Sequence, residues 1–98
     1  MSGMTGGVGE VQCATDEVKE IAEKVRGEAE TKTGRQFSEY VAVQFCSQVV
    51  AGTNFFIKVQ VSEGGECIHL RVYRDLQQTL SLSGVLTDKT LQDPLKYF

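Results

Sequence analysis

Two segments of strand character, residues 39–46 and 55–61, flank a short apolar run that ends in glycine, Gln48–Gly52. In both segments apolar residues alternate with others at a period of two, as in strands that bury one face. The sequence therefore predicts a β-hairpin with Gln48–Gly52 at its tip. Turns are normally exposed to water and carry polar residues, so two valines at this tip would be exposed apolar side chains. An exposed apolar tip on a small polar protein is typical of a contact site.

A helical pattern precedes this hairpin and begins at Thr15. Its apolar residues recur at the spacing of one helix face. They are Val18, Ile21, Ala22, Val25 and Ala29. Thr15 is suited to cap the first turn and Gly34 to end the last, whereas Gly27 lowers helix stability. We therefore expect one continuous helix that lies across one face of the sheet.

The rest of the chain has the pattern of strands. A Gly-Gly turn at 62–66 leads to a strand at 67–73, a short strand follows at 80–82, and 95–98 supplies the last one. In the first strand of the predicted hairpin, residues 39–46, alternation places Val41, Val43 and Phe45 on one face of the sheet. It places Tyr40, Ala42, Gln44 and Cys46 on the other face. One long helix packed across a twisted antiparallel sheet of about five strands is an α+β fold.

Length and composition fit one domain. The chain has 98 residues, of which 41% are hydrophobic, which is enough for a modest core that needs no disulfide bonds or metal ions to stabilise it. The first ten residues are rich in glycine and contain little that could be buried. We therefore expect a single domain over residues 1–98, with a flexible N-terminal trunk at about residues 1–12.

Charge and cysteine content exclude several function classes. The net charge of -3, with dispersed basic residues, argues against a basic surface that binds nucleic acid. No apolar segment is long enough to span a membrane. Cys13, Cys46 and Cys67 form neither a disulfide framework nor a metal-binding spacing, so we expect free thiols and neither metal nor cofactor. No signal peptide is visible, and free thiols are typical of reducing compartments. We therefore expect a cytoplasmic or nuclear protein.

Several of these segments resemble a known family. Gln48, Val50 and Gly52 match the QxVxG signature of cystatins, and residues 47–59 closely resemble the type 1 branch, the stefins. Similarity to stefins extends to residues 21–26, 68–73 and 97–98. The resemblance implies a cystatin-like fold. It also implies reversible, tight-binding, non-covalent and competitive inhibition of papain-like cysteine proteases such as cathepsins.

Stefins fill the protease cleft with a wedge of three segments, and the resemblance assigns these segments to positions of this chain. The implied protease-binding residues are Met4, Thr5 and Gly6 in the trunk, Gln48, Val49, Val50, Ala51 and Gly52 in the hairpin tip, and Leu76 and Gln77 in the second loop. Gly3 and Gly7 are alternatives to Gly6 as the trunk glycine, so the register of the trunk stays open.

The second loop departs from the stefin pattern. Gln77 stands where a proline usually follows the leucine, and the loop is about three residues shorter than in stefins. A loop without this proline is less preorganised in the unbound protein. We therefore expect a weaker or differently tuned contribution from Leu76 and Gln77.

A thiol enzyme is an alternative that uses other residues. It would pair a cysteine with His69, the one histidine of the chain. Cys67 would share a strand face with His69 at about 7 Å, which is beyond hydrogen-bond distance. No Asp or Asn stands near them in sequence to orient the imidazole. We therefore expect no catalytic residue, and we expect His69 to be solvated.

A self-associating structural protein is the second alternative. An apolar hairpin on a β-rich domain could open, and the helix and first strand could then exchange between two chains. Opening the hairpin would straighten the tip, so a swapped dimer should not inhibit. We therefore expect a monomer as the main inhibitory form and a domain-swapped dimer as the competing state.

Overall fold

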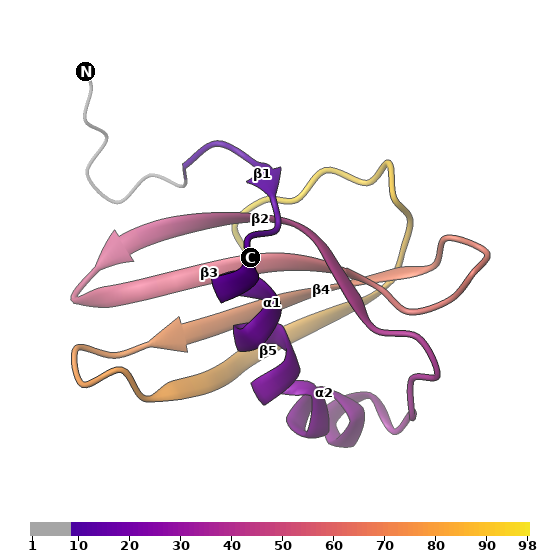
Figure 1. Cartoon of the computed structure of the whole chain (residues 1–98), viewed down its shortest axis with the longest axis horizontal. Coiled ribbons are helices and arrows are strands. Elements are labelled where there is room, and N and C mark those ends of the chain that lie inside the picture. The colour runs from indigo at the N-terminus through magenta and orange to yellow at the C-terminus, as the bar shows by residue number, and fades with distance from the viewer. Residues whose placement is uncertain (1–8) are drawn as a thin grey trace.

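Two consecutive helices, α1 (Asp16–Lys24) and α2 (Arg26–Thr33), lie across one face of the sheet in the computed structural model, which describes residues 9–98 (Figure 1). Thr15 Oγ1 accepts a hydrogen bond from Val18 N at 3.2 Å, and Gly34 ends α2 with φ of 69°. Both caps were predicted. Among these residues neither helix is long and apolar enough to cross a membrane.

The prediction of one continuous helix is wrong, because the helix breaks at Val25. The backbone of this residue has φ of -99° and ψ of 6°, outside helical values. Val25 is β-branched and stands two residues before Gly27, and both residue types weaken a helix interior. Val25 and Ala29 are nevertheless both buried, so the apolar stripe continues across the break.

Within the described part of the chain, five antiparallel strands form one sheet in the order β1-β2-β3-β4-β5. Their bounds are β1 Gln12–Cys13, β2 Val41–Val50, β3 Gly52–Gln60, β4 Cys67–Arg74 and β5 Leu80–Lys89. The predicted α+β fold, with helices packed across an antiparallel sheet of about five strands, is confirmed. The set of strands differs from the expectation, however, because β1 falls at the expected end of the trunk and β5 is longer than the predicted strand at 80–82.

The predicted division of β2 into two faces is wrong because the strand contains a bulge. The register with β3 shifts between Ala42 and Gln44, which leaves Val43 as the extra residue. An extra residue reverses the alternation of all side chains that follow it. Ala42 and Phe45 therefore both contribute to the core under the helices, although alternation placed them on opposite faces.

The core under the helices is built from the apolar faces of α1, α2 and the four long strands. Its buried strand residues include Phe55, Ile57, Val59, Ile68, Leu70, Val72 and Leu82. A smaller cluster lies on the other face of the sheet, where Cys46 and Phe56 pack against Leu95 and Phe98. The C-terminal segment, residues 90–98, therefore covers the face that the helices leave open (Figure 1).

The C-terminal segment does not form the strand predicted at 95–98. Leu95 is buried against the sheet face, and the carbonyl oxygen of Leu91 accepts a hydrogen bond from Lys58 Nζ at 2.7 Å. Pro94 lacks a backbone N–H, which disfavours a paired strand at this point. The segment thus closes the core by packing across the sheet instead of adding to its edge.

Candidate functional site

Two hairpin turns lie together at one end of the sheet, on the left in Figure 1. The first joins β2 to β3 and the second joins β4 to β5. β3 and β4 are neighbours, and Thr53 at the start of β3 pairs with Arg74 at the end of β4. The sheet therefore holds both turns side by side.

The first tip is narrower than predicted. β2 continues to Val50 and β3 begins at Gly52, and these two residues pair with each other. Only Ala51 lies between the strands. Val49 is 75% exposed and Val50 is 43% exposed, so the tip presents valine side chains to solvent as the sequence predicted. The strands therefore stay paired up to a turn of one residue.

Gln48 has a different role from the residues that follow it. Its side chain is buried, and its Oε1 accepts a hydrogen bond from Asn54 Nδ2 at 3.1 Å. The two residues are direct partners in the β2–β3 ladder. A buried amide pair of this kind fixes the register of the strands below the tip. Asn54 could not be predicted as the partner of Gln48, because the register of the hairpin sets which residues face each other.

Gly52 and Tyr73 bring the end of β4 against the first tip. Gly52 has φ of 103°, and a Cβ built on it would lie 2.4 Å from the carbonyl oxygen of Arg74. The Tyr73 hydroxyl donates a hydrogen bond to the carbonyl oxygen of Ala51. The sequence signal for Tyr73 was weak, since alternation gave its face of β4 but not its neighbour in space.

The second loop, residues 75–79, is organised by Asp75. Its Oδ1 accepts hydrogen bonds from Gln77 N at 2.8 Å and Thr79 N at 2.9 Å. Side-chain acceptors of this kind stabilise turns locally. Leu76 is 75% exposed, and Gln77 is exposed beside it. Asp75 therefore braces a loop that lacks the proline, and Leu76 forms the second exposed apolar tip.

Met4, Thr5 and Gly6, together with the alternatives Gly3 and Gly7, lie outside the described residues. The described chain begins next to the first hairpin, where Gly9 N donates a hydrogen bond to Ser47 O at 2.8 Å. Further along, Gln12 pairs with Phe45 in the β1–β2 ladder. Residues 9–13 therefore run along β2, the strand that leads to the first tip.

Cys67 and His69 do not form an activated pair. His69 is 1% exposed, so the expectation that it is solvated is wrong. Burial, together with Lys58 and Lys89, lowers the pKa of His69 to about 4. Burial raises the pKa of the Cys67 thiol, whereas reactive thiols have lowered pKa values. His69 is buried because residues 90–98 cover its face of the sheet, which alternation within β4 cannot reveal.

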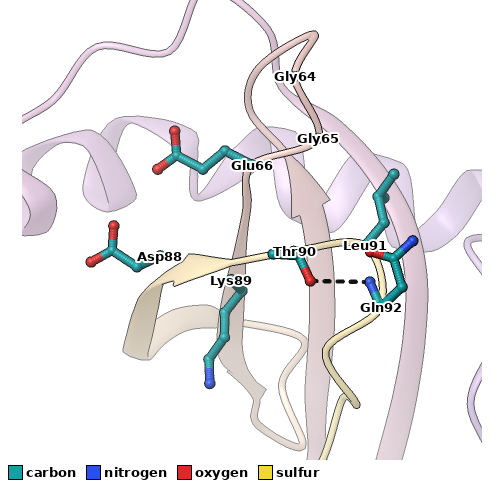
Figure 2. Close-up of a pocket in the computed structure, with 8 residues that line it drawn as sticks. All are labelled: Gly64, Gly65, Glu66, Asp88, Lys89, Thr90, Leu91 and Gln92. Carbon is teal, nitrogen blue, oxygen red and sulfur yellow. Dashed lines mark hydrogen bonds between the residues drawn. The ribbon is translucent and has the colours of Figure 1, made fainter.

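A hollow of about 550 Å³ lies at the opposite end of the sheet from the two tips, beside the β3–β4 turn. Figure 2 shows the carboxylates of Glu66 and Asp88 on one side of it and Leu91 with Gln92 on the other. The Glu66 carboxylate is already paired with Arg35, at 2.6 Å. Within residues 9–98 no group of His, Cys, Asp and Glu side chains could hold a metal ion. The hollow therefore offers no assembled set of metal-binding side chains.

The fold and the tip geometry define a class of protein, namely an α+β protein that carries two braced apolar hairpin tips at one end of its sheet. Comparison with known proteins agrees with the resemblance to cystatins. A family model described as the cystatin domain matches residues 6–92. The chain belongs to the cystatin family, a family of cysteine protease inhibitors.

Similar proteins of almost equal length place the chain among stefin-type cystatins. Cystatin-A of Mus musculus is 44% identical over 96 residues, which cover 95% of this chain and 97% of the relative. Cystatin-B of Macaca fuscata fuscata is 45% identical over 98 residues, covering 97% and 99%. Leukocyte cysteine proteinase inhibitor 1 of Sus scrofa is 42% identical over 98 residues, covering 97% and 94%.

Proposed function

We propose that the chain inhibits papain-like cysteine proteases of the cathepsin type reversibly and competitively, without a covalent bond. The inhibitory surface is the end of the sheet with the two tips, together with the trunk at Met4, Thr5 and Gly6. The exposure of Val49 and Leu76, each 75% on adjacent braced tips, is the observation that carries this proposal.

The apolar tips supply the binding energy. Burying one valine or leucine side chain is worth about 1.5–3 kcal/mol. Val49, Val50 and Ala51 are offered by the first tip and Leu76 by the second. The tips are braced in the free protein, so little of this energy is lost to ordering them. Gln48 and Gly52 contribute indirectly by shaping the first tip.

The hairpin explains why a protease would bind the chain without cleaving it. A peptide bond must reach the catalytic thiol in an extended and accessible strand. Ala51, by contrast, lies in a turn whose flanking residues Val50 and Gly52 are paired with each other. The ladder would have to open before the chain could adopt a substrate conformation. The tip therefore enters the cleft as a rigid plug.

The trunk can reach the same cleft. Gly6 is three residues before Gly9, and three residues of extended chain span at most about 11 Å. Gly9 itself is bonded to Ser47, in the strand that leads to the first tip. A glycine without Cβ allows close contact with a protease surface. Met4 and Thr5 would then occupy subsites on one side of the cleft and the second loop would occupy the other.

The test is titration of papain with the purified chain and with two valine variants. Val49→Asp places a charge on the first tip, and we expect the inhibition constant to rise at least a hundredfold. Val41→Asp is a matched control, because Val41 is 54% exposed but lies at the other end of β2. We expect this control to inhibit normally. Full papain activity with excess wild-type chain would overturn the proposal, as would equal effects of the two variants.

We further propose that the protein acts in the cytoplasm or nucleus. The described cysteines Cys13, Cys46 and Cys67 are all free thiols, and the last two are buried. Structural disulfides are common in small secreted proteins and rare in reducing compartments. Fractionation of cells with an antibody to the chain tests the location, and recovery mainly from the culture medium would contradict it.

A further inference from the structure

Tyr73 is held firmly in the sheet while its hydroxyl reaches the first tip. It pairs with Asn54 on β3 and with Ser81 on β5, so hydrogen-bonded ladders fix its backbone on both sides. Its hydroxyl donates to the carbonyl oxygen of Ala51. Ala51 is the one residue between the paired residues Val50 and Gly52. Tyr73 is therefore a fixed donor to the turn residue of the tip.

The contact also joins the two tips. A Cβ on Gly52 would lie 2.9 Å from the Tyr73 hydroxyl oxygen and 3.0 Å from its Cε1 atom. The ring therefore lies directly against the first turn. The residues after Tyr73 are Arg74, the last residue of β4, and Asp75, which organises the second loop. One side chain thus links the turn of the first hairpin to the base of the second.

A turn with exposed valines needs such a link to keep one shape. Neither Val49 nor Val50 is buried, and Ala51 is exposed, so core packing does not hold the tip. When only a fraction of free molecules has the binding shape, the apparent affinity falls by that fraction. A hydrogen bond from a fixed donor raises the fraction and lowers the ordering cost of binding.

We propose that the Tyr73 hydroxyl is a positioning group that holds the Ala51 carbonyl, and with it the Val49–Val50 tip, in the shape that enters the protease. This inference rests on the inhibitory function proposed above. It assigns the role to the hydroxyl and not to the ring. Tyr73 acts through Ala51 and makes no contact with the protease itself.

The first test compares Tyr73→Phe with Tyr40→Phe in association and dissociation kinetics with papain. Tyr40 is a matched control, since its hydroxyl also donates to a backbone carbonyl, that of Ala22 at 2.7 Å, far from the tips. We expect Tyr73→Phe to slow association about threefold to tenfold and to leave dissociation unchanged. We expect Tyr40→Phe to change neither rate.

Two kinetic results would overturn the inference. Faster dissociation of Tyr73→Phe with unchanged association would mean that the hydroxyl contacts the protease. Equal effects of Tyr73→Phe and Tyr40→Phe would mean that the loss of any hydrogen bond from a tyrosine hydroxyl to a backbone carbonyl is enough. If the wild-type chain failed to inhibit papain, the proposed function would be wrong, and no association or dissociation rate with papain could be measured.

The second test needs no protease. Backbone amide relaxation by NMR reports the mobility of residues 49–53 in the free protein. We expect Tyr73→Phe to increase motion at these residues only, with the melting temperature nearly unchanged. Unchanged tip motion in this variant would overturn the inference even if the wild-type chain inhibits well.

Discussion

Gly52 is constrained both by its backbone and by the space around it. Its φ of 103° is rarely adopted by residues with a side chain. A Cβ would also lie 2.4 Å from the carbonyl oxygen of Arg74, a backbone atom of the central sheet that cannot move aside. We expect Gly52→Ala to lower the free energy of unfolding by about 2–4 kcal/mol and to weaken inhibition strongly. Urea unfolding and papain titration measure the two effects.

Gly34 provides the control for this substitution. Its φ is 69°, but within residues 9–98 no atom outside its chain neighbours and its own helix backbone lies within 4 Å of the position of a Cβ. Gly34→Ala should therefore cost only the backbone strain, about 1–2 kcal/mol, and leave inhibition unchanged. An equal loss of stability in Gly52→Ala would show that the contact with β4 does not constrain the tip.

Local chemistry made some residues of the site predictable. The exposure of Val49 and the turn at Gly52 follow from an apolar run that ends in glycine between two strands. Asn54 and Tyr73 were not predictable in the same way, because their partners Gln48 and Ala51 are brought to them by strand register. Sequence alternation gives the face of a strand but not the residue opposite.

At the scale of elements, the same distinction between local and distant causes holds. The caps Thr15 and Gly34 depend on their own helix ends, and both were predicted. The bulge at Val43 depends on pairing with β3, so the predicted faces of β2 failed. The segment 95–98 looked like a strand by composition, but Leu95 and Phe98 instead pack on Phe56. Tertiary contacts override local propensity at these places.

The C-terminal segment creates a buried polar site beneath it on β3 and β4. Lys58 and His69 are direct cross-strand partners, 2% and 1% exposed. Lys58 Nζ donates to Leu91 O, whereas His69 Nε2 has no hydrogen-bond partner among the described residues. Lys58 and Lys89 disfavour a charged His69, while Asp93 favours it weakly. Neutral His69 is therefore the form that this arrangement accepts.

This burial makes stability depend on pH. The pKa of His69 falls from 6.5 to about 4 on folding, so between these values the unfolded chain binds a proton that the folded protein does not. Its stabilising contribution is complete above pH 6.5 and is lost as pH falls toward 4. We expect the free energy of unfolding to decrease by about 2–3 kcal/mol between pH 7 and pH 4.5. Urea unfolding at the two pH values measures it.

His69→Leu separates this effect from other titrations. Asp93 and Glu66 have lowered pKa values, so their contributions are lost only below their ordinary values of 3.8 and 4.5. Leucine has a volume close to that of histidine and cannot bind a proton. The variant should therefore show a nearly flat stability between pH 7 and pH 4.5. An unchanged pH dependence in His69→Leu would assign the effect to other groups.

For the whole molecule, the fold separates the buried core from the two exposed tips along the length of the sheet. The helices cover one face and the C-terminal segment covers the other, while the two tips extend beyond this covered region (Figure 1). Substitutions of the exposed side chains Val49 and Leu76 can therefore leave the core intact. The pairing of tips across β3 and β4 followed from topology, which strand patterns alone could not give.

The turn that we propose enters the protease cleft is also a hinge at which two chains could exchange their first elements. A one-residue turn with Gly52 at φ of 103° is a short hinge, and short strained hinges favour domain swapping. Exchange would extend the chain through Ala51, break its hydrogen bond to Tyr73 and remove the tip. We expect papain inhibition only in the monomer fraction from size-exclusion chromatography, with each fraction re-run after assay to confirm its size. Inhibition by a stable dimer fraction would show that the folded turn is not needed for binding.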